Sequence, residues 1–136
     1  MERAIDVVVQ AFEWFNSVMA KPDYVIRREE VERRFTPDAQ MIANGQVKCA
    51  GIDAHLKHFQ ELQKKLKSFR IRLPLKESIS TAAEAAAYYQ IEYVAADGST
   101  GIIHDCALWR IRDNKLALMV ETVSFEGKDV PLENHA

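Results

Sequence analysis

The amino-acid sequence predicts an α+β fold in one domain that spans residues 1–136. Apolar residues recur at helical spacing in three segments of the first half of the chain. Segments with strand patterning then follow one another through the second half. With 48% hydrophobic and 28% charged residues, the composition is that of an ordinary globular protein. A chain of this length buries roughly two thirds of the surface that it exposes when unfolded, so it can form a substantial core.

The first helix is predicted over residues 2–20 and the second over residues 24–35. The first helix has a wide apolar stripe, which indicates neighbours on more than one side: Ile5, Val8, Val9, Phe12 and Phe15, flanked by Val7, Trp14 and Val18. Pro22 separates the two helices, because proline cannot continue a helix without losing a backbone hydrogen bond. The run RREEVERR in the second helix sets opposite charges at helical spacing and is interpreted as a solvent-exposed face.

A β-hairpin and a third helix come next. Asn44-Gly45 is a strong signal for a two-residue turn, because both positions of such a turn need positive φ. The third helix is predicted over residues 53–67, with a buried stripe made of Ile52, Leu56, Phe59, Leu62 and Leu66. His55 and His58 flank this stripe, where a histidine either packs in the core or contacts a ligand.

Alternating and apolar patterns predict four further strands, over residues 69–80, 86–96, 101–112 and 115–126. Pro74 cannot donate a backbone hydrogen bond, so it places the first of these strands at an edge or at a bulge. The polar tail, residues 127–136, is expected to fray.

Composition argues against several functional classes. The net charge of −2 gives no basic footprint for nucleic acid. No apolar run reaches the roughly 20 residues that a membrane helix needs. The first residues carry Glu2 and Asp6 and no small-residue cleavage site, so we interpret them as a helix and not as a signal peptide. Cys49 and Cys106 lack metal-ligand spacing and are interpreted as free, buried thiols of a cytoplasmic protein.

Two acidic residues in the last two strands are the main functional clue. Asp105 and Glu121 interrupt apolar strands that are joined at Asp113-Asn114. A two-residue turn there pairs Arg112 with Lys115 and puts the two acids on opposite faces of the sheet. A three-residue loop that also includes Arg112 puts Asp105 directly opposite Glu121. We predict the longer loop, because it leaves both faces of the hairpin largely apolar.

In that register, one face lines a pocket and contains Ile103, Ala107, Trp109, Ala117, Met119, Val123 and Phe125. The other face pairs Leu108 with Leu118 and Cys106 with Val120, and is expected to form the interface of a homodimer. Two carboxyl groups in one apolar pocket raise each other's pKa and can share a proton, which yields an acid and a base. Two alternatives remain open. Asp105 could lie in solvent or pair with an arginine such as Arg70 or Arg72, and Glu121 could form a salt bridge across a dimer.

The order of elements, together with the stretches FTPDAQMIANGQ, AGIDAHLKHF and LWRIRDNKLALMVETV, resembles the nuclear transport factor 2-like superfamily. The resemblance covers nearly the whole chain and is greatest to the SnoaL-like branch, with its polyketide cyclases, limonene epoxide hydrolase and ketosteroid isomerase. It implies a cystatin-like cone, in which a curved antiparallel sheet wraps around an apolar pocket covered by three helices. Many members of the superfamily are dimers. The shared motifs are diffuse, so they indicate a fold more than a reaction.

Carried over residue by residue, the resemblance separates the members of that branch. The catalytic base of ketosteroid isomerase falls near Ala43-Asn44, its proton donor on Ala107, and the tyrosine of its first helix near Trp14. These departures argue against steroid isomerase chemistry. The cyclases and the epoxide hydrolase carry an acid on the last strand after a Gly-Lys-Ile type of turn. Asn114-Lys115-Leu116 matches that turn, and Glu121 falls on the acid.

We therefore expect a hydrolase, cyclase or isomerase that acts on a small, mainly apolar molecule without a cofactor or a metal. Asp105 and Glu121 would be its general acid and base. The expected pocket wall consists of Trp14, Tyr24, Met41, His58, Tyr89, Trp109 and Met119. The alternative is a non-catalytic ligand-binding or association module of the same fold. An open pocket that holds both acids would favour the enzyme, and a filled pocket beside a large interface would favour the module.

Overall fold

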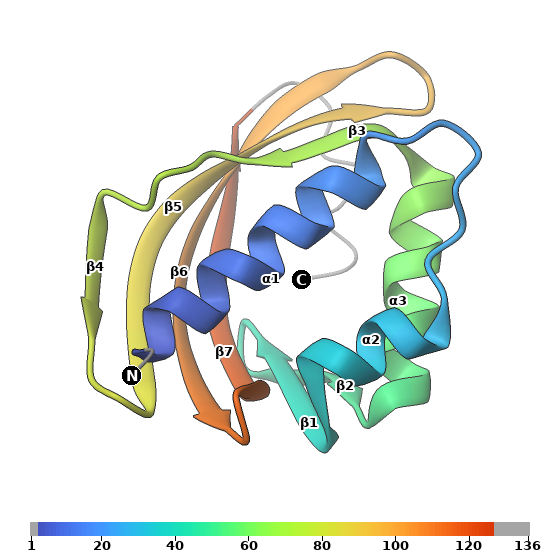
Figure 1. The fold of residues 1–136 in the computed structure, drawn as a ribbon. Helices are drawn as coiled ribbons and strands as arrows, with labels where there is room; N and C mark the ends of the chain where they lie inside the picture. Colours follow the sequence, from blue (N-terminus) through green and yellow to red (C-terminus); the bar gives the residue numbers. More distant parts are fainter. Residues whose placement is uncertain (1–2, 127–136) are drawn as a thin grey trace.

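The computed structural model describes residues 3–126 and contains three helices and seven strands within them (Figure 1). The helices are α1 (Ala4–Met19), α2 (Arg28–Arg34) and α3 (Ile52–Lys65). The strands are β1 (Phe35–Ala43), β2 (Gln46–Ala50), β3 (Leu66–Ile71), β4 (Glu77–Ser80), β5 (Glu84–Ala95), β6 (Thr100–Arg112) and β7 (Lys115–Glu126). The tail predicted to fray, residues 127–136, lies outside the described residues.

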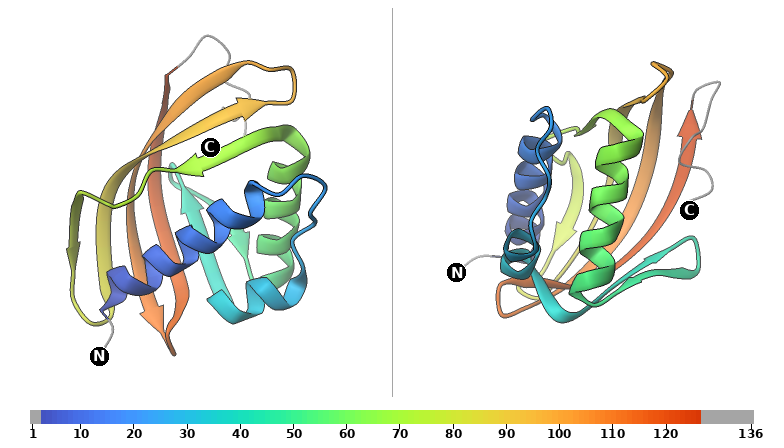
Figure 2. Two further views of the ribbon diagram at one scale, coloured as in Figure 1. Left: turned by 45° about the horizontal axis from the view of Figure 1, so that its top comes forward. Right: turned by 90° about the vertical axis from the view of Figure 1, so that its right-hand side faces the viewer.

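The strands form one sheet in the order β2-β1-β7-β6-β5-β3, with β4 also paired to β5. Every pair is antiparallel except β1 and β7, which run parallel. The long strands β5, β6 and β7 curl, and the helices lie on the concave side of the sheet (Figure 2). This arrangement confirms the predicted α+β fold, in which a curved sheet is covered by three helices.

The core lies between α1 and the concave face of the sheet. The apolar stripe predicted for α1 is buried, and Phe12 and Phe15 project from it toward β3, β5 and β6. Trp109 of β6 is fully buried and contacts the rings of Phe12 and Tyr89, with centroids 5.6 and 5.9 Å away. Aromatic rings therefore form much of the contact between this helix and the sheet.

The strand predicted over residues 69–80 is divided in two. Pro74 lies between β3 and β4, and the Leu73–Pro74 peptide bond is cis. Each of these short strands pairs only with β5, so the predicted edge position is confirmed.

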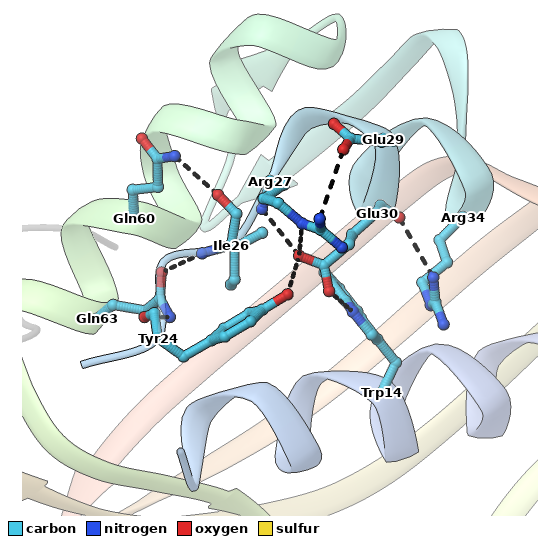
Figure 3. A network of polar contacts seen from close by, with 9 residues as sticks. All are labelled: Trp14, Tyr24, Ile26, Arg27, Glu29, Glu30, Arg34, Gln60 and Gln63. Atoms are coloured by element: carbon cyan, nitrogen blue, oxygen red, sulfur yellow. Dashed lines mark hydrogen bonds and ion pairs between the residues drawn. The ribbon is translucent and has the colours of Figure 1, made fainter. Parts of the chain in front are cut away.

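The second helix starts later than predicted, because residues 24–27 are not helical. Side-chain amides of α3 replace the helical hydrogen bonds there. Gln63 Nε2 donates to the Tyr24 carbonyl oxygen (2.7 Å), and Gln60 Nε2 donates to the Ile26 carbonyl oxygen (2.9 Å). The Ile26 amide in turn donates to Gln63 Oε1 (3.0 Å). These bonds hold the α1–α2 connection against α3 (Figure 3).

The prediction of two buried free thiols is half wrong. Both cysteines are free, and Cys49 is buried, but Cys106 is exposed on the convex face of the sheet. None of the described helices combines the length and the apolar character that a membrane crossing requires.

Candidate functional site

The turn between β6 and β7 has two residues, so the predicted three-residue loop is wrong. Asp113 and Asn114 both have positive φ, 55° and 59°, and Arg112 pairs with Lys115. Asn and Asp tolerate this left-handed conformation better than other non-glycine residues, which is why the short turn forms without glycine.

A β-bulge directly after the turn brings the two acids back to one face. Ile111 pairs with Leu116, but Arg110 pairs with Leu118, so Ala117 is an extra residue in β7. The bulge shifts every later pair by one residue. The prediction that the two acids lie directly opposite each other is therefore also wrong.

In the observed register, Asp105 lies opposite Val123 and Glu121 lies opposite Ala107. The acids are diagonal neighbours on the concave face. Diagonal Cβ atoms of antiparallel strands lie about 7 Å apart, which is within reach of long side chains such as that of glutamate. The sheet thus carries both carboxyl groups on the side that the helices cover.

Two adjoining cavities lie under the helices. The first, which we call the polar cavity, has a volume of about 100 Å³ and includes Lys48, Asp105 and Glu121 in its lining. The second, the aromatic cavity, has a volume of about 120 Å³ and is lined by both acids together with Phe12, Trp14, Phe15, Phe35, Phe59, Tyr89 and Trp109. The acids therefore line both cavities, whereas Lys48 lines only one and these rings only the other.

Asp105 is buried, with 2% of its surface exposed. Burial, reinforced by the neighbouring Glu121 carboxyl, raises the pKa of Asp105 to about 10. Tyr89 opposes part of this effect, since its hydroxyl donates to Asp105 Oδ2 (2.9 Å). Burial beside Asp105 also raises the pKa of Tyr89 well above its usual range, so the phenol remains a donor. The raised pKa favours the protonated form of Asp105.

The two oxygens of the Asp105 carboxyl group differ in their contacts. Oδ2 accepts from Tyr89, whereas the buried Oδ1 has no hydrogen-bond partner among the described residues. Two ionised carboxylates cannot hydrogen-bond to each other. Once Asp105 is protonated, Oδ1 can donate to the Glu121 carboxylate or to a ligand. The alternative pairing of Asp105 with an arginine does not occur, because Arg70 and Arg72 both pair with Glu92.

Six of the seven side chains predicted for the pocket wall line a cavity. Met41 and His58 line both cavities, and Trp14, Tyr89, Trp109 and Met119 line the aromatic cavity. Tyr24 lines neither of them. Its hydroxyl donates to Glu30 Oε2 (2.7 Å), away from the acid pair.

Glu30 organises a polar network that fixes Trp14 (Figure 3). Its carboxylate accepts hydrogen bonds from Trp14 Nε1 (3.2 Å), the Tyr24 hydroxyl (2.7 Å) and the Arg27 amide (2.8 Å). The Arg34 guanidinium lies 4.7 Å from the centre of the Trp14 ring. Burial tends to raise the pKa of Glu30, but these hydrogen bonds outweigh it and lower that pKa below its usual value. The network thus holds an ionised carboxylate behind the cavity wall.

Sequence reasoning missed Glu30 and Lys48. The run that contains Glu30 was interpreted as an exposed face, yet only 7% of Glu30 is exposed. Lys48 lies in a second irregularity, because Met41 pairs with Cys49 while Ile42 pairs with Val47. Ordinary alternation from the turn points Val47 to solvent and Lys48 toward the polar cavity, and the extra residue turns the next side chain, Cys49, inward as well.

Asp105, Glu121 and His58 share a cavity wall, but within residues 3–126 no group of three or more His, Cys, Asp or Glu side chains is placed to hold a metal ion.

Comparison with known proteins places the fold. No protein family model matches the chain, and neither does any curated protein sequence. Among solved structures, an NTF2-like protein from Anabaena variabilis is 16% identical, with 91% of each chain covered and a TM-score of 0.72. A protein from Jannaschia sp. assigned to the SnoaL-like polyketide cyclases is 13% identical, with 88% of this chain and 84% of that chain covered and a TM-score of 0.68.

An LEH-like epoxide hydrolase from M. tuberculosis is 12% identical, with 88% of this chain and 84% of that chain covered and a TM-score of 0.65. At such low identity, the shared architecture carries the likeness and the reaction does not follow from it. The resemblance noted in the sequence is confirmed, and the chain has the nuclear transport factor 2-like fold that SnoaL-like proteins share.

Proposed function

We propose that this protein is a cofactor-independent enzyme of hydrolase, cyclase or isomerase type that acts on a small, mainly apolar molecule. Glu121 is the general base and Asp105 is the general acid. The observation that carries the proposal is the pair of carboxyl groups in one cavity, one of which, Asp105, is buried in a setting that raises its pKa. Groups of the same type whose pKa values are pushed apart are a common basis for acid–base catalysis.

The roles follow from the environment of each carboxyl group. The Glu121 side chain takes a proton from a ligand carbon or from a water molecule that attacks the ligand. Asp105 Oδ1 gives its proton to the ligand oxygen on which negative charge develops. Tyr89 holds Asp105 Oδ2 and so directs Oδ1 toward the cavity. The apolar rings around the aromatic cavity exclude water, which strengthens these interactions.

Two further observations support an enzyme of this kind. Solved structures with this fold include an epoxide hydrolase and a protein assigned to the polyketide cyclases. Neither cysteine is in a disulfide bond, which fits the reducing cytoplasm, the compartment that we propose.

Replacing Glu121 by glutamine tests the base. Two probes report the two kinds of chemistry: hydrolysis of styrene oxide, and exchange of the protons next to the carbonyl of 2-tetralone in heavy water, followed by NMR. Because the variant keeps the shape of the side chain but loses its basicity, we expect the rate with the responsive probe to fall by about 100-fold or more. Folding, checked by circular dichroism, should be unchanged.

Glu126→Gln is the matched control, since Glu126 lies on the same strand and is exposed. Its rates should equal those of the wild type. Unchanged turnover in Glu121→Gln would remove Glu121 from the mechanism. A wild-type protein that is inactive with both probes would favour the second candidate function.

That second candidate is a non-catalytic ligand-binding or association module. It is favoured by the small size of the cavities, since pockets for drug-sized ligands start at about 300 Å³. The apolar side chains on the convex face also fit association. Leu108 is 39% exposed and Tyr88 42% exposed there, with Leu118 and Val120 beside them.

We propose that this convex face forms a homodimer, whichever function holds. Sedimentation at about 50 μM should then give the mass of two chains, and Leu108→Asp should shift it to the mass of one, because an isologous interface buries the new charge twice. Leu56→Asp is no suitable control, since Leu56 packs against the core. Val25→Asp places the charge instead on an apolar residue of the α1–α2 connection that is 61% exposed and lies away from the sheet, and should leave the mass unchanged. A wild-type protein that sediments as a monomer would overturn this proposal.

A further inference from the structure

Lys48 is a basic residue inside the proposed site. Its side chain lines the polar cavity together with Asp105 and Glu121. Among the described residues that line either cavity, it is the only lysine or arginine. Lys48 reaches this position because side chains alternate along β2 and the neighbouring Val47 points to solvent.

Within the described part of the chain, the Lys48 ammonium has no partner of its own. It makes no ion pair and no side-chain hydrogen bond with any other residue in the range 3–126. Most of the arginines behave differently: Arg70 and Arg72 share Glu92, and Arg112 pairs with Asp38. Asp105 and Glu121 line the same cavity, yet neither forms an ion pair with Lys48. The charge of Lys48 is therefore available to a ligand.

The two cavities place different kinds of side chain along a ligand that fills both. Aromatic rings such as Phe12 and Trp109 line only the aromatic cavity, the two acids line both cavities, and Lys48 lines only the polar cavity. A molecule that fills both cavities has its ring system at one end, its reacting atoms beside the acids, and its other end beside an ammonium group.

From this order we infer that the substrate is a small planar aromatic molecule with an anionic oxygen, as in a carboxylate or a phenolate, and that Lys48 binds this oxygen. Lys48 is then a specificity-determining residue. The inference rests on the function proposed above only in that it uses the same cavities. Lys48 is a half-buried residue beside an apolar wall, and without an anion its ammonium gains nothing to offset any water that it loses. With an anion, it makes a charge-assisted hydrogen bond in a partly water-excluded site.

A pair of probes of equal shape tests this inference. 2-Naphthoate carries a carboxylate, and 2-naphthamide replaces it by a neutral amide. Binding is followed by calorimetry and by quenching of the fluorescence of Trp14 and Trp109, which line the aromatic cavity. In the wild type, 2-naphthoate should bind more tightly than 2-naphthamide. Lys48→Met should weaken the binding of 2-naphthoate by about tenfold or more, because a hydrogen bond to a charged group is lost. It should leave the affinity for 2-naphthamide unchanged.

Two further variants sharpen the test. Lys57→Met removes an exposed lysine of α3 that lines neither cavity, and should leave both affinities unchanged. Lys48→Arg keeps the positive charge and should retain the preference for 2-naphthoate.

The outcomes separate this inference from the proposed function. If both probes bind equally well and Lys48→Met changes both affinities alike, Lys48 does not select an anion, while the pocket itself stands. If neither probe binds the wild type at millimolar concentration, the small-molecule pocket fails and the inference fails with it.

Discussion

Asp105→Asn is expected to stabilise the protein relative to the wild type, and to do so increasingly as pH rises. Asparagine is close in size to a protonated aspartate and keeps an oxygen that can accept from the Tyr89 hydroxyl, which lies 2.9 Å from Asp105 Oδ2. Its amide can also donate to Glu121. It cannot ionise, however, so the variant avoids the cost of a negative charge in the cavity.

The direction of this pH dependence follows from the raised pKa of Asp105. Burial raises the pKa of Asp105 in the folded protein from 3.8 to about 10. A raised pKa in the folded state means that the folded protein holds this proton more tightly than the unfolded chain. The stability that the proton provides is complete below the unfolded pKa and is lost as pH rises through the folded pKa. The slope between these limits is at most about 1.4 kcal/mol per pH unit, and local rearrangement reduces it.

Urea unfolding of both proteins at about pH 5 and about pH 9 measures this effect. The free energy of unfolding of Asp105→Asn, minus that of the wild type, should be larger at the higher pH. Asp97→Asn serves as control. Hydrogen bonds from Ser99 lower the pKa of Asp97, so this group stays ionised between the two pH values. The difference in free energy of unfolding between Asp97→Asn and the wild type should therefore be the same at both. A difference for Asp105→Asn that is also flat would mean that Asp105 is ionised in the folded protein.

The same substitution separates stability from function. If Asp105 is the general acid, its neutral amide replacement cannot give up a proton, so turnover should fall while stability rises at alkaline pH. Opposite effects of this kind mark groups that a protein keeps at some cost in stability. If the buried aspartate were kept only for its structural contacts, its replacement would not raise stability while lowering turnover.

The sequence was enough to predict the fold and the face on which the acids lie. The helical stripes, the Asn44-Gly45 turn and the long C-terminal strands are local patterns, so each could be interpreted by itself. The register of the last hairpin could not be predicted from such a local pattern, because it depends on the bulge at Ala117. The predicted loop and the observed turn with bulge place the acids differently along β7. Both put Asp105 and Glu121 on one face, since side chains alternate with a period of two.

The parts of the site that were missed have one physical cause. Lys48 and Glu30 are charged residues in segments that are mostly exposed, and such residues usually face solvent. Their burial depends on contacts with other elements: Glu30 meets Trp14 and Tyr24, and Lys48 faces a cavity that β1, β6 and β7 also line. No pattern within either segment signals these contacts.

Trp109→Ala is expected to destabilise the protein by about 3–5 kcal/mol, the usual range for removing a large aromatic side chain from a core. Trp109 is fully buried and contacts Phe12 of α1 and Tyr89 of β5. The cavity left by the indole ring would join the aromatic cavity that Trp109 already lines. The contact between α1 and the sheet, on which the shape of the pocket depends, would weaken. Chemical unfolding followed by circular dichroism measures the loss.

Trp109→Phe divides this effect into packing and hydrogen bonding. The buried Nε1 of Trp109 has no acceptor among the described residues, so removing this donor breaks no hydrogen bond within them. The phenylalanine variant should therefore lose much less stability than the alanine variant. Arg110→Ala, at the next residue of the strand, removes only an exposed ion pair with Glu84 and should cost about 1 kcal/mol or less. If Trp109→Ala cost no more than Arg110→Ala, the core under α1 would not depend on this ring. The aromatic cavity would then have to be held open by the rest of its wall.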